Sequence, residues 1–283
     1  MKILIAGKYK LASGLTPDAT VEAEYGDVVV EGRQYTLAHH AQRYRHMPAP
    51  CLFGNLPSFD GDILISHIDL DTVGGCLALY GRKPDDDRFW QGAAFVDTRG
   101  PHRIIELPAR TQGMLQAYWA FRSTQERAKY GKLCDVTDVV LQHEETIKRI
   151  IAGDPDLIGQ GKTWAREIGQ KVESCLVSEN ERLRAFKTGD VFCNAAYYSP
   201  SMKKYIPAIV SWNTETCGIL ISFEDGGAAH DASAVAGKLW GVLASGHVGI
   251  AGSPRGWELP DDRMQAEFDR AIAEVLSLLT PSQ

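Results

Sequence analysis

Residues 63–81, which read ILISHIDLDTVGGCLALYG, decide the fold predicted for this chain. The apolar run Ile63–Ile65 predicts a buried strand, because it follows the turn-forming residues Asp60, Gly61 and Asp62. The glycine pair and the apolar residues after it predict a helix. Polar residues lie between strand and helix, where open α/β sheets place their ligand sites. The stretch therefore predicts an α/β fold with a site at the carboxyl edge of the sheet.

Three side chains that can bind divalent ions stand at this strand end: His67, Asp69 and Asp71. Side chains of an extended segment alternate between its two faces, so we expect all three to point the same way. One imidazole and two carboxylates, without a thiolate, suit a hard or borderline divalent cation. The alternative is a polar loop in which an aspartate caps the next helix. Because capping requires only one of the two aspartates, we favour the metal site.

Two adjacent histidines, His39 and His40, follow a predicted short strand at Tyr35–Leu37. Neighbouring side chains of an extended segment point to opposite faces, so at most one of the pair should face a given ion. We expect the pair to have a metal or substrate role, and a polar surface tip is the alternative.

A further carboxylate, Asp97, follows Gln91–Val96, which we interpret as another strand. A site with two metal ions needs a carboxylate that bridges them, and Asp97 is our candidate. The loop after it contains Arg99, a candidate substrate-binding residue, and His102, a candidate proton donor. The alternative is a surface turn that begins with an aspartate.

The composition is that of a soluble globular protein, with 44% hydrophobic and 23% charged residues. A net charge of −6 argues against a long duplex nucleic acid as partner, but a bound metal ion would still allow a small phosphorylated ligand. No apolar run reaches the roughly 18–20 residues that span a bilayer, so we expect no membrane partner. The six cysteines form no CxxC pair, which favours reduced thiols and a cytoplasmic location.

The order of the predicted elements divides the chain into three parts. Residues 1–155 should form a mainly parallel sheet domain, 156–187 a helical linker with a solvated charged end, and 188–283 a smaller mixed-sheet α/β domain. In the last part we expect three strands and two helices, at Val191–Tyr198, Ala208–Trp212, Gly218–Phe223, Ala232–Leu239 and Asp261–Leu279.

Glycines flank His247 in a loop of this last part, and Gly246 directly precedes it. Glycine lets the backbone approach a ligand closely, and free amide groups suit phosphate or carboxylate oxygens. We therefore expect His247 and Gly246 to contact the substrate.

Together these motifs resemble the DHH phosphoesterase superfamily, in the branch that carries the DHH-associated C-terminal domain. SHIDLDTVG at 66–74 looks like its first motif, and FVD at 95–97 like its second. Residues 220–252, LISFEDGGAAHDASAVAGKLWGVLASGHVGIAG, are similar to the strand, helix and glycine loop of the associated domain. The resemblance implies hydrolysis that depends on manganese or magnesium in the first domain, and binding of phosphate or a terminal nucleotide by the loop.

The chain departs from this family at the motif that gives the family its name. The Asp-His-His that should follow the second motif is absent, and the nearest string, Ala38-His39-His40, precedes the first motif. Either the sheet order is rearranged so that this pair still reaches the site, or His102 takes the histidine role. Asp135 is the best match to the family's fourth motif, and a helix cap is its alternative role.

We therefore expect a phosphoesterase with two Mn²⁺ or Mg²⁺ ions, acting on a nucleotide or short oligonucleotide. His40 or His102 would protonate the leaving oxygen. The alternatives are a hydrolase of a non-nucleotide phosphate such as inorganic polyphosphate, and a catalytically decayed nucleotide-binding regulator. A homodimer is left open. The residues expected to hold the metals are His67, Asp69, Asp71, Asp97, His39 and Asp135.

Overall fold

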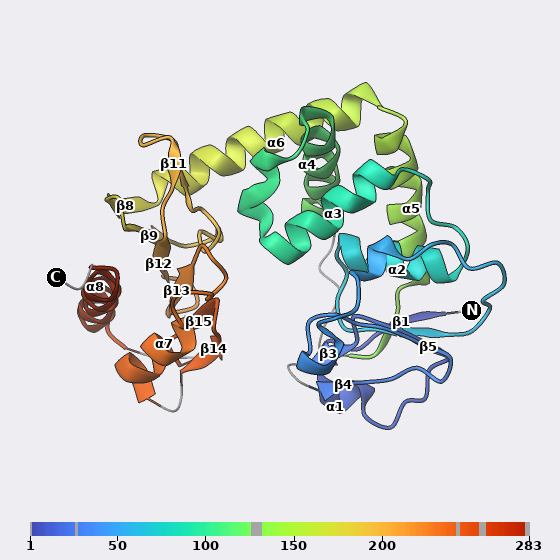
Figure 1. Ribbon diagram of the computed structural model, residues 1–283, viewed down its shortest axis with the longest axis horizontal. Coiled ribbons are helices and arrows are strands. Elements are labelled where there is room, and N and C mark those ends of the chain that lie inside the picture. Colours follow the sequence, from blue (N-terminus) through green and yellow to red (C-terminus); the bar gives the residue numbers. More distant parts are fainter. Residues whose placement is uncertain (1, 26–27, 126–131, 242–243, 255–258, 281–283) are drawn as a thin grey trace. The chain divides into compact units, whose positions relative to one another are not determined.

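The computed structural model describes residues 2–25, 28–125, 132–241, 244–254 and 259–280. The chain divides into two compact units, residues 1–165 and 166–283 (Figure 1). Each unit contains its own sheet, and helix α6 (Pro155–Ser174) passes from the first unit into the second. The fold is mixed α/β, with a mainly parallel first sheet and a mixed second sheet, as the sequence predicted.

The first sheet has the strand order β5-β2-β6-β1-β7. Four of its strands run parallel, and β7 pairs antiparallel with β1 at one edge. Parallel strands end at the same side of a sheet, so the segments that follow β2, β5 and β6 begin next to one another. The strands are β1 (Ile3–Ile5), β2 (Ala19–Val21), β5 (Tyr35–Leu37), β6 (Ile63–Ile65) and β7 (Cys134–Asp135).

Strand β6 and the helix after it, α2 (Leu70–Leu79), form as predicted for residues 63–81. All residues of both elements are buried. A Cβ atom on Gly74 would lie 2.5 Å from the Cys51 Cβ, and one on Gly75 would lie 2.7 Å from the Val21 Cγ1. The two glycines therefore let strand β2 and the 3-10 helix η2 (Pro50–Leu52) pack directly on α2.

Helices α2 to α5 lie on one side of the first sheet in Figure 1. The prediction of a strand at 91–96 is wrong, because these residues belong to α3 (Asp87–Arg99). Asp86 caps this helix by accepting the Phe89 N–H at 2.8 Å. No helix within the described part of the chain is both long and apolar enough to cross a membrane. The remaining helices of this unit are α1 (Tyr9–Ala12), α4 (Ala109–Ser123), α5 (Thr137–Ile151), η1 (Gln42–Tyr44) and η3 (Pro101–Glu106), beside a hairpin of β3 (Glu24–Tyr25) and β4 (Val28–Val29).

The second sheet has the order β14-β15-β13-β12-β9-β8, in which only β12 and β9 pair in parallel. Helices α7 and α8 share a hydrophobic core with the sheet residues Ala208 and Val210, whereas Ile209 belongs to a separate core with Val172 of α6. The elements are β8 (Leu176–Glu179), β9 (Leu183–Thr188), β12 (Ala208–Asn213), β13 (Gly218–Phe223), β14 (Ser245–His247), β15 (Ile250–Gly252), α7 (Ala232–Trp240), α8 (Asp261–Leu278), and a hairpin of β10 (Tyr198–Ser199) and β11 (Lys204–Tyr205).

Three local predictions for this unit are wrong. Residues 176–187, expected to belong to the helical linker, form β8 and most of β9, and α6 ends at Ser174. Arg184, expected at a solvated end, is fully buried, because Glu173 and Glu179 neutralise its guanidinium at 2.6 and 2.7 Å. Residues 191–197, expected to be a strand, form a loop before β10.

Candidate metal centre

Three carboxylates from separate segments of the first unit meet around one imidazole nitrogen, that of His39. His39 follows β5, and its Nε2 lies 3.4 Å from Glu22 Oε1. The same nitrogen lies 3.3 Å from Asp71 Oδ2 and 3.2 Å from Asp97 Oδ2. Glu22 directly follows β2, Asp71 lies in the first turn of α2, and Asp97 lies in the last turn of α3. The parallel order β5-β2-β6 brings His39, Glu22 and Asp71, which come after these strands, to the same edge of the sheet.

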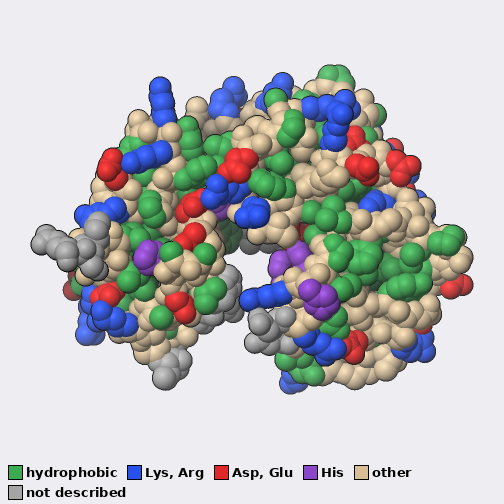
Figure 2. Space-filling model, viewed as in Figure 1, with side chains coloured by type: hydrophobic (Ala, Val, Ile, Leu, Met, Phe, Trp, Pro, Cys, Tyr) green, Lys and Arg blue, Asp and Glu red, His purple; other side chains and the backbone are tan. Residues whose placement is uncertain are grey.

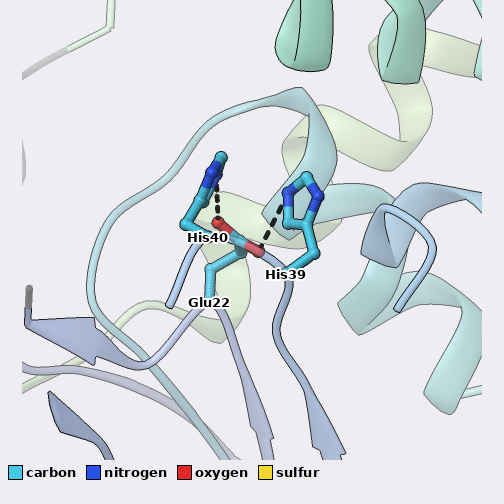
Figure 3. Close-up of side chains that lie close together, drawn as sticks. All are labelled: Glu22, His39 and His40. Carbon is cyan, nitrogen blue, oxygen red and sulfur yellow. Dashed lines mark ion pairs between the residues drawn. The ribbon is translucent and has the colours of Figure 1, made fainter. Parts of the chain in front are cut away.

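The carboxylate of Glu22 lies between two imidazole rings, as Figure 3 shows. Its Oε1 faces His39, and its Oε2 lies 3.1 Å from His40 Nε2. His40 Nε2 is also 3.8 Å from Asp97 Oδ2. The side chain of His40 is 52% exposed, whereas that of His39 is 6% exposed. Figure 2 shows histidine side chains at the surface of this unit. The centre therefore has a buried floor and a rim open to solvent.

The buried side chains of this centre include too little positive charge to balance their carboxylates. Both oxygens of Glu22, His39 Nε2, Asp71 Oδ2 and Asp97 Oδ2 are buried and have no hydrogen-bond partner among the described residues. Burial raises the pKa of the Glu22 carboxyl to about 7. For His39, burial lowers the pKa, but the interactions with Asp71, Asp97 and Glu22 outweigh it and raise it to about 10. In this arrangement, protons on Glu22 and His39 offset part of the negative charge that a bound cation would otherwise offset.

The donor set fits one or more divalent ions. Within the described residues, two overlapping groups place their ligand atoms within 4.8 Å of one another: Glu22, His39 and His40, and His39, Asp71 and Asp97. Carboxylate and imidazole donors without thiolates suit a hard or borderline divalent cation. A divalent ion would satisfy the orphaned oxygens that are otherwise costly to bury.

A main-chain group orients Asp71. The amide of Cys51 donates to Asp71 Oδ1 at 2.7 Å, which leaves Oδ2 directed toward His39. Cys51 belongs to η2, which reaches this position because Gly74 has no side chain. The packing of η2 on α2 therefore fixes one of the candidate metal ligands.

The prediction that His67, Asp69 and Asp71 point the same way is wrong. The chain does not stay extended, because α2 begins at Leu70 and Asp69 is its N-cap, accepting the Thr72 N–H at 2.8 Å. Asp69 Oδ2 pairs with His67 Nε2 at 2.9 Å, and neither residue belongs to the two groups around His39. The capping alternative thus holds for Asp69, whereas Asp71 reaches the centre.

The other candidates from the sequence lie outside these groups. Asp135 is exposed on β7 and accepts the Thr137 N–H at 3.0 Å, at the start of α5. His102 lies in η3, where burial and the charge of Arg103 lower its pKa to about 4. Arg99 is exposed at the end of α3, two residues after Asp97. Gly246 and His247 lie on β14 of the second unit, and the His247 side chain is outside the described part of the structure.

Sequence reasoning missed Glu22, which contributes both of its oxygens to the centre. The signal was present, because Glu22 is a carboxylate placed directly after the short run Ala19–Val21. A three-residue run that contains a threonine is a weak strand pattern. Glu22 also has a positive φ of 50°, a backbone conformation that no motif announced.

Comparisons with known proteins do not assign a family. No family model and no curated protein matches the chain. Among solved structures, it is similar to a pGpG-specific phosphodiesterase, PggH, from Vibrio cholerae, with 9% identity, a TM-score of 0.43, and coverage of 87% of this chain and 82% of that one. An uncharacterized protein from Helicobacter pylori G27 has 11% identity and a TM-score of 0.26, with coverage of 84% and 75%. At TM-scores below 0.5, neither likeness supports a conclusion about this chain.

Proposed function

We propose that this chain is a divalent-metal-dependent phosphoesterase that hydrolyses a phosphoester of a nucleotide or a short oligonucleotide. The observation that carries the proposal is the gathering of three carboxylates around His39, with His40 at the rim. The nucleotide as substrate rests on the resemblance of residues 220–252 to a substrate-binding domain.

The buried part of the centre would hold the metal. Glu22, His39, Asp71 and Asp97 supply the ligands, and Glu22 and Asp97 are the two carboxylates near both histidines. Bound divalent ions supply Lewis acidity toward phosphoryl oxygens and a water nucleophile at neutral pH. A carboxylate that contacts two ions can hold them close enough for this chemistry, a role that we assign to Asp97 or Glu22.

His40 would act as the proton donor. The neighbouring Glu22 carboxylate raises its pKa despite burial, which favours the protonated form that a proton donor requires. Its exposure allows it to reach the oxygen of a leaving group. His102 is less suited to this task, since its lowered pKa keeps it neutral.

The second unit would bind the part of the substrate that is not cleaved, through Gly246 and His247. Arg99, close to Asp97 in sequence, is a further candidate for contact with the substrate. These assignments come from the sequence motifs, as does the use of Mn²⁺ or Mg²⁺.

The experiment is a hydrolysis screen in Mn²⁺ and in chelator. The panel contains dinucleotides, mononucleotides, simple phosphate esters and inorganic polyphosphate. We expect Mn²⁺-dependent cleavage of a nucleotide ester, abolished in Asp71→Asn and retained in Asp135→Asn. Cleavage of polyphosphate alone would replace the substrate assignment, and cleavage that persists in chelator or in Asp71→Asn would refute the metal mechanism.

A further inference from the structure

Arg122, which belongs to none of the sequence motifs, is hydrogen-bonded to the loop beside the metal centre. Arg122 lies in the last turn of α4, and its Nη2 donates to the carbonyl of Ile68 at 2.6 Å. Ile68 lies in the loop between β6 and α2, which leads directly to Asp71. At the other end of this loop, the hydroxyl of Ser66 donates to the main-chain carbonyl of Glu22. The loop that Arg122 contacts is therefore joined to the centre at both ends.

The positive charge of Arg122 acts to lower the pKa values of two histidines, His143 and His67. Burial and, after it, the charge of Arg122 lower the pKa of His143 to about 4. Burial lowers the pKa of His67, Asp69 and Glu22 together raise it by more, and the charge of Arg122 opposes that rise. The guanidinium thus acts electrostatically on the loop, in addition to its hydrogen bond.

Arg122 also has N–H groups that make no hydrogen bond within the described part of the chain. A guanidinium carries five N–H groups, and the structure shows one hydrogen bond for Arg122 among the described residues. The side chain is exposed and has no carboxylate partner in the described ranges, whereas Arg82 pairs with Glu144 and Arg149 with Asp154. An exposed guanidinium that is anchored on one side can bind an anion on the other.

The charge balance of the centre favours such an anion-binding group. Glu22, Asp71 and Asp97 carry three negative charges when ionised, and two divalent ions would leave one positive charge in excess. That excess offsets only part of the charge of a phosphomonoester dianion such as adenosine monophosphate. A guanidinium matches two phosphate oxygens with parallel N–H groups, which a lysine cannot do.

We propose that Arg122 is a substrate-binding residue, whose free N–H groups hold the phosphate of a phosphoester at the edge of the metal centre. This inference rests on the proposed function and deepens it. It assigns phosphate recognition in the first unit to α4, rather than to Arg99 on α3. The competing role is that of a brace that only supports the Ile68 carbonyl.

The test compares two arginines on the same helix. Arg110 lies at the opposite end of α4 and also donates through Nη2 to a carbonyl, that of Ile151 at 3.4 Å. Twelve residues of helix separate it from Arg122 by about 18 Å. Arg122→Ala, Arg122→Lys and Arg110→Ala are prepared, and two titrations are run on each full-length protein. Mn²⁺ binding is measured first, and then the binding of adenosine monophosphate to the Mn²⁺-loaded protein.

We expect Arg122→Ala to bind adenosine monophosphate about ten- to a hundredfold more weakly, the effect of losing a charge-assisted hydrogen bond. Arg122→Lys should recover part of this loss, and Arg110→Ala should match the wild type. Mn²⁺ affinity should be unchanged in all three. Equal nucleotide affinity in Arg122→Ala and wild type would overturn the inference, as would a loss explained by weaker Mn²⁺ binding. A wild type that binds no Mn²⁺ would instead contradict the proposed function, and the first titration alone reveals it.

Discussion

Replacing Glu22 by glutamine should change how the metal-free protein responds to pH. Burial raises the pKa of this carboxyl from 4.5 to about 7, so the folded state holds the proton more tightly than the unfolded state does. Stability therefore falls as pH rises from about 4.5 to about 7. A shift of about 2.5 pKa units, at 1.36 kcal/mol each, corresponds to about 3 kcal/mol.

His39 acts in the same direction over a higher range. Its pKa is raised from 6.5 to about 10, so it adds stability that is present below about 6.5 and lost as pH rises through about 10. In Glu22→Gln the loss between about pH 4.5 and 7 should disappear. The loss at higher pH should shrink, because Glu22 is one of the groups that raise the His39 pKa. The variant should therefore be more stable than the wild type at pH 8 in chelator.

The assay is equilibrium urea unfolding in chelator at steps from pH 4.5 to 9, repeated with Mn²⁺. Mn²⁺ should stabilise the wild type strongly at pH 8 and Glu22→Gln much less, since the ion loses a ligand. The matched control is Glu144→Gln, another buried glutamate of this unit, which pairs with Arg82 and Lys148. That variant should lose stability but keep the stabilisation by Mn²⁺. An unchanged pH dependence in Glu22→Gln would refute the assignment of a buried, electrostatically strained carboxyl.

The remaining predictions concern the histidines and η2. His39→Ala should abolish Mn²⁺ binding and His40→Ala should lower kcat, whereas His102→Ala should be nearly silent; a strong activity loss in His102→Ala would reverse this assignment. Gly74→Ala should cost about 1–3 kcal/mol of stability through overpacking against Cys51 and should also weaken Mn²⁺ binding, since the Cys51 amide orients Asp71. Thermal unfolding with and without Mn²⁺ measures both effects, and a Gly74→Ala protein with wild-type Mn²⁺ affinity would show that η2 does not position Asp71.

The fold of the first unit was largely predictable from one stretch. Three apolar residues, a polar tip and two glycines specify β6 and α2, since each feature has a direct physical cause in burial, capping or close packing. The directions of the side chains that follow β6 were less predictable. An alternating pattern places Asp69 and Asp71 on one face only while the chain stays extended, and the helix starts between them.

Other errors arose where tertiary contacts override the local pattern. The residues buried in α3, among them Phe89, Trp90, Ala93 and Ala94, repeat with a helical period, but the apolar run 93–96 resembles a strand. Arg184 suggested a solvated segment, although two glutamates allow it to lie inside the second unit. Glu22 follows a weak strand pattern, and its position beside His39 depends on β2 lying between β5 and β6. In each case the deciding partner is distant in sequence.

The central claim is that the edge of the first sheet binds divalent metal through residues grouped around His39. The most direct measurement is the Mn²⁺ content per chain after equilibrium dialysis, determined for the wild type, Asp71→Asn and Asp135→Asn. The account predicts two ions per wild-type chain, an unchanged content in Asp135→Asn, and loss of metal in Asp71→Asn. A wild type without bound Mn²⁺, or an Asp71→Asn protein that retains both ions, would contradict it.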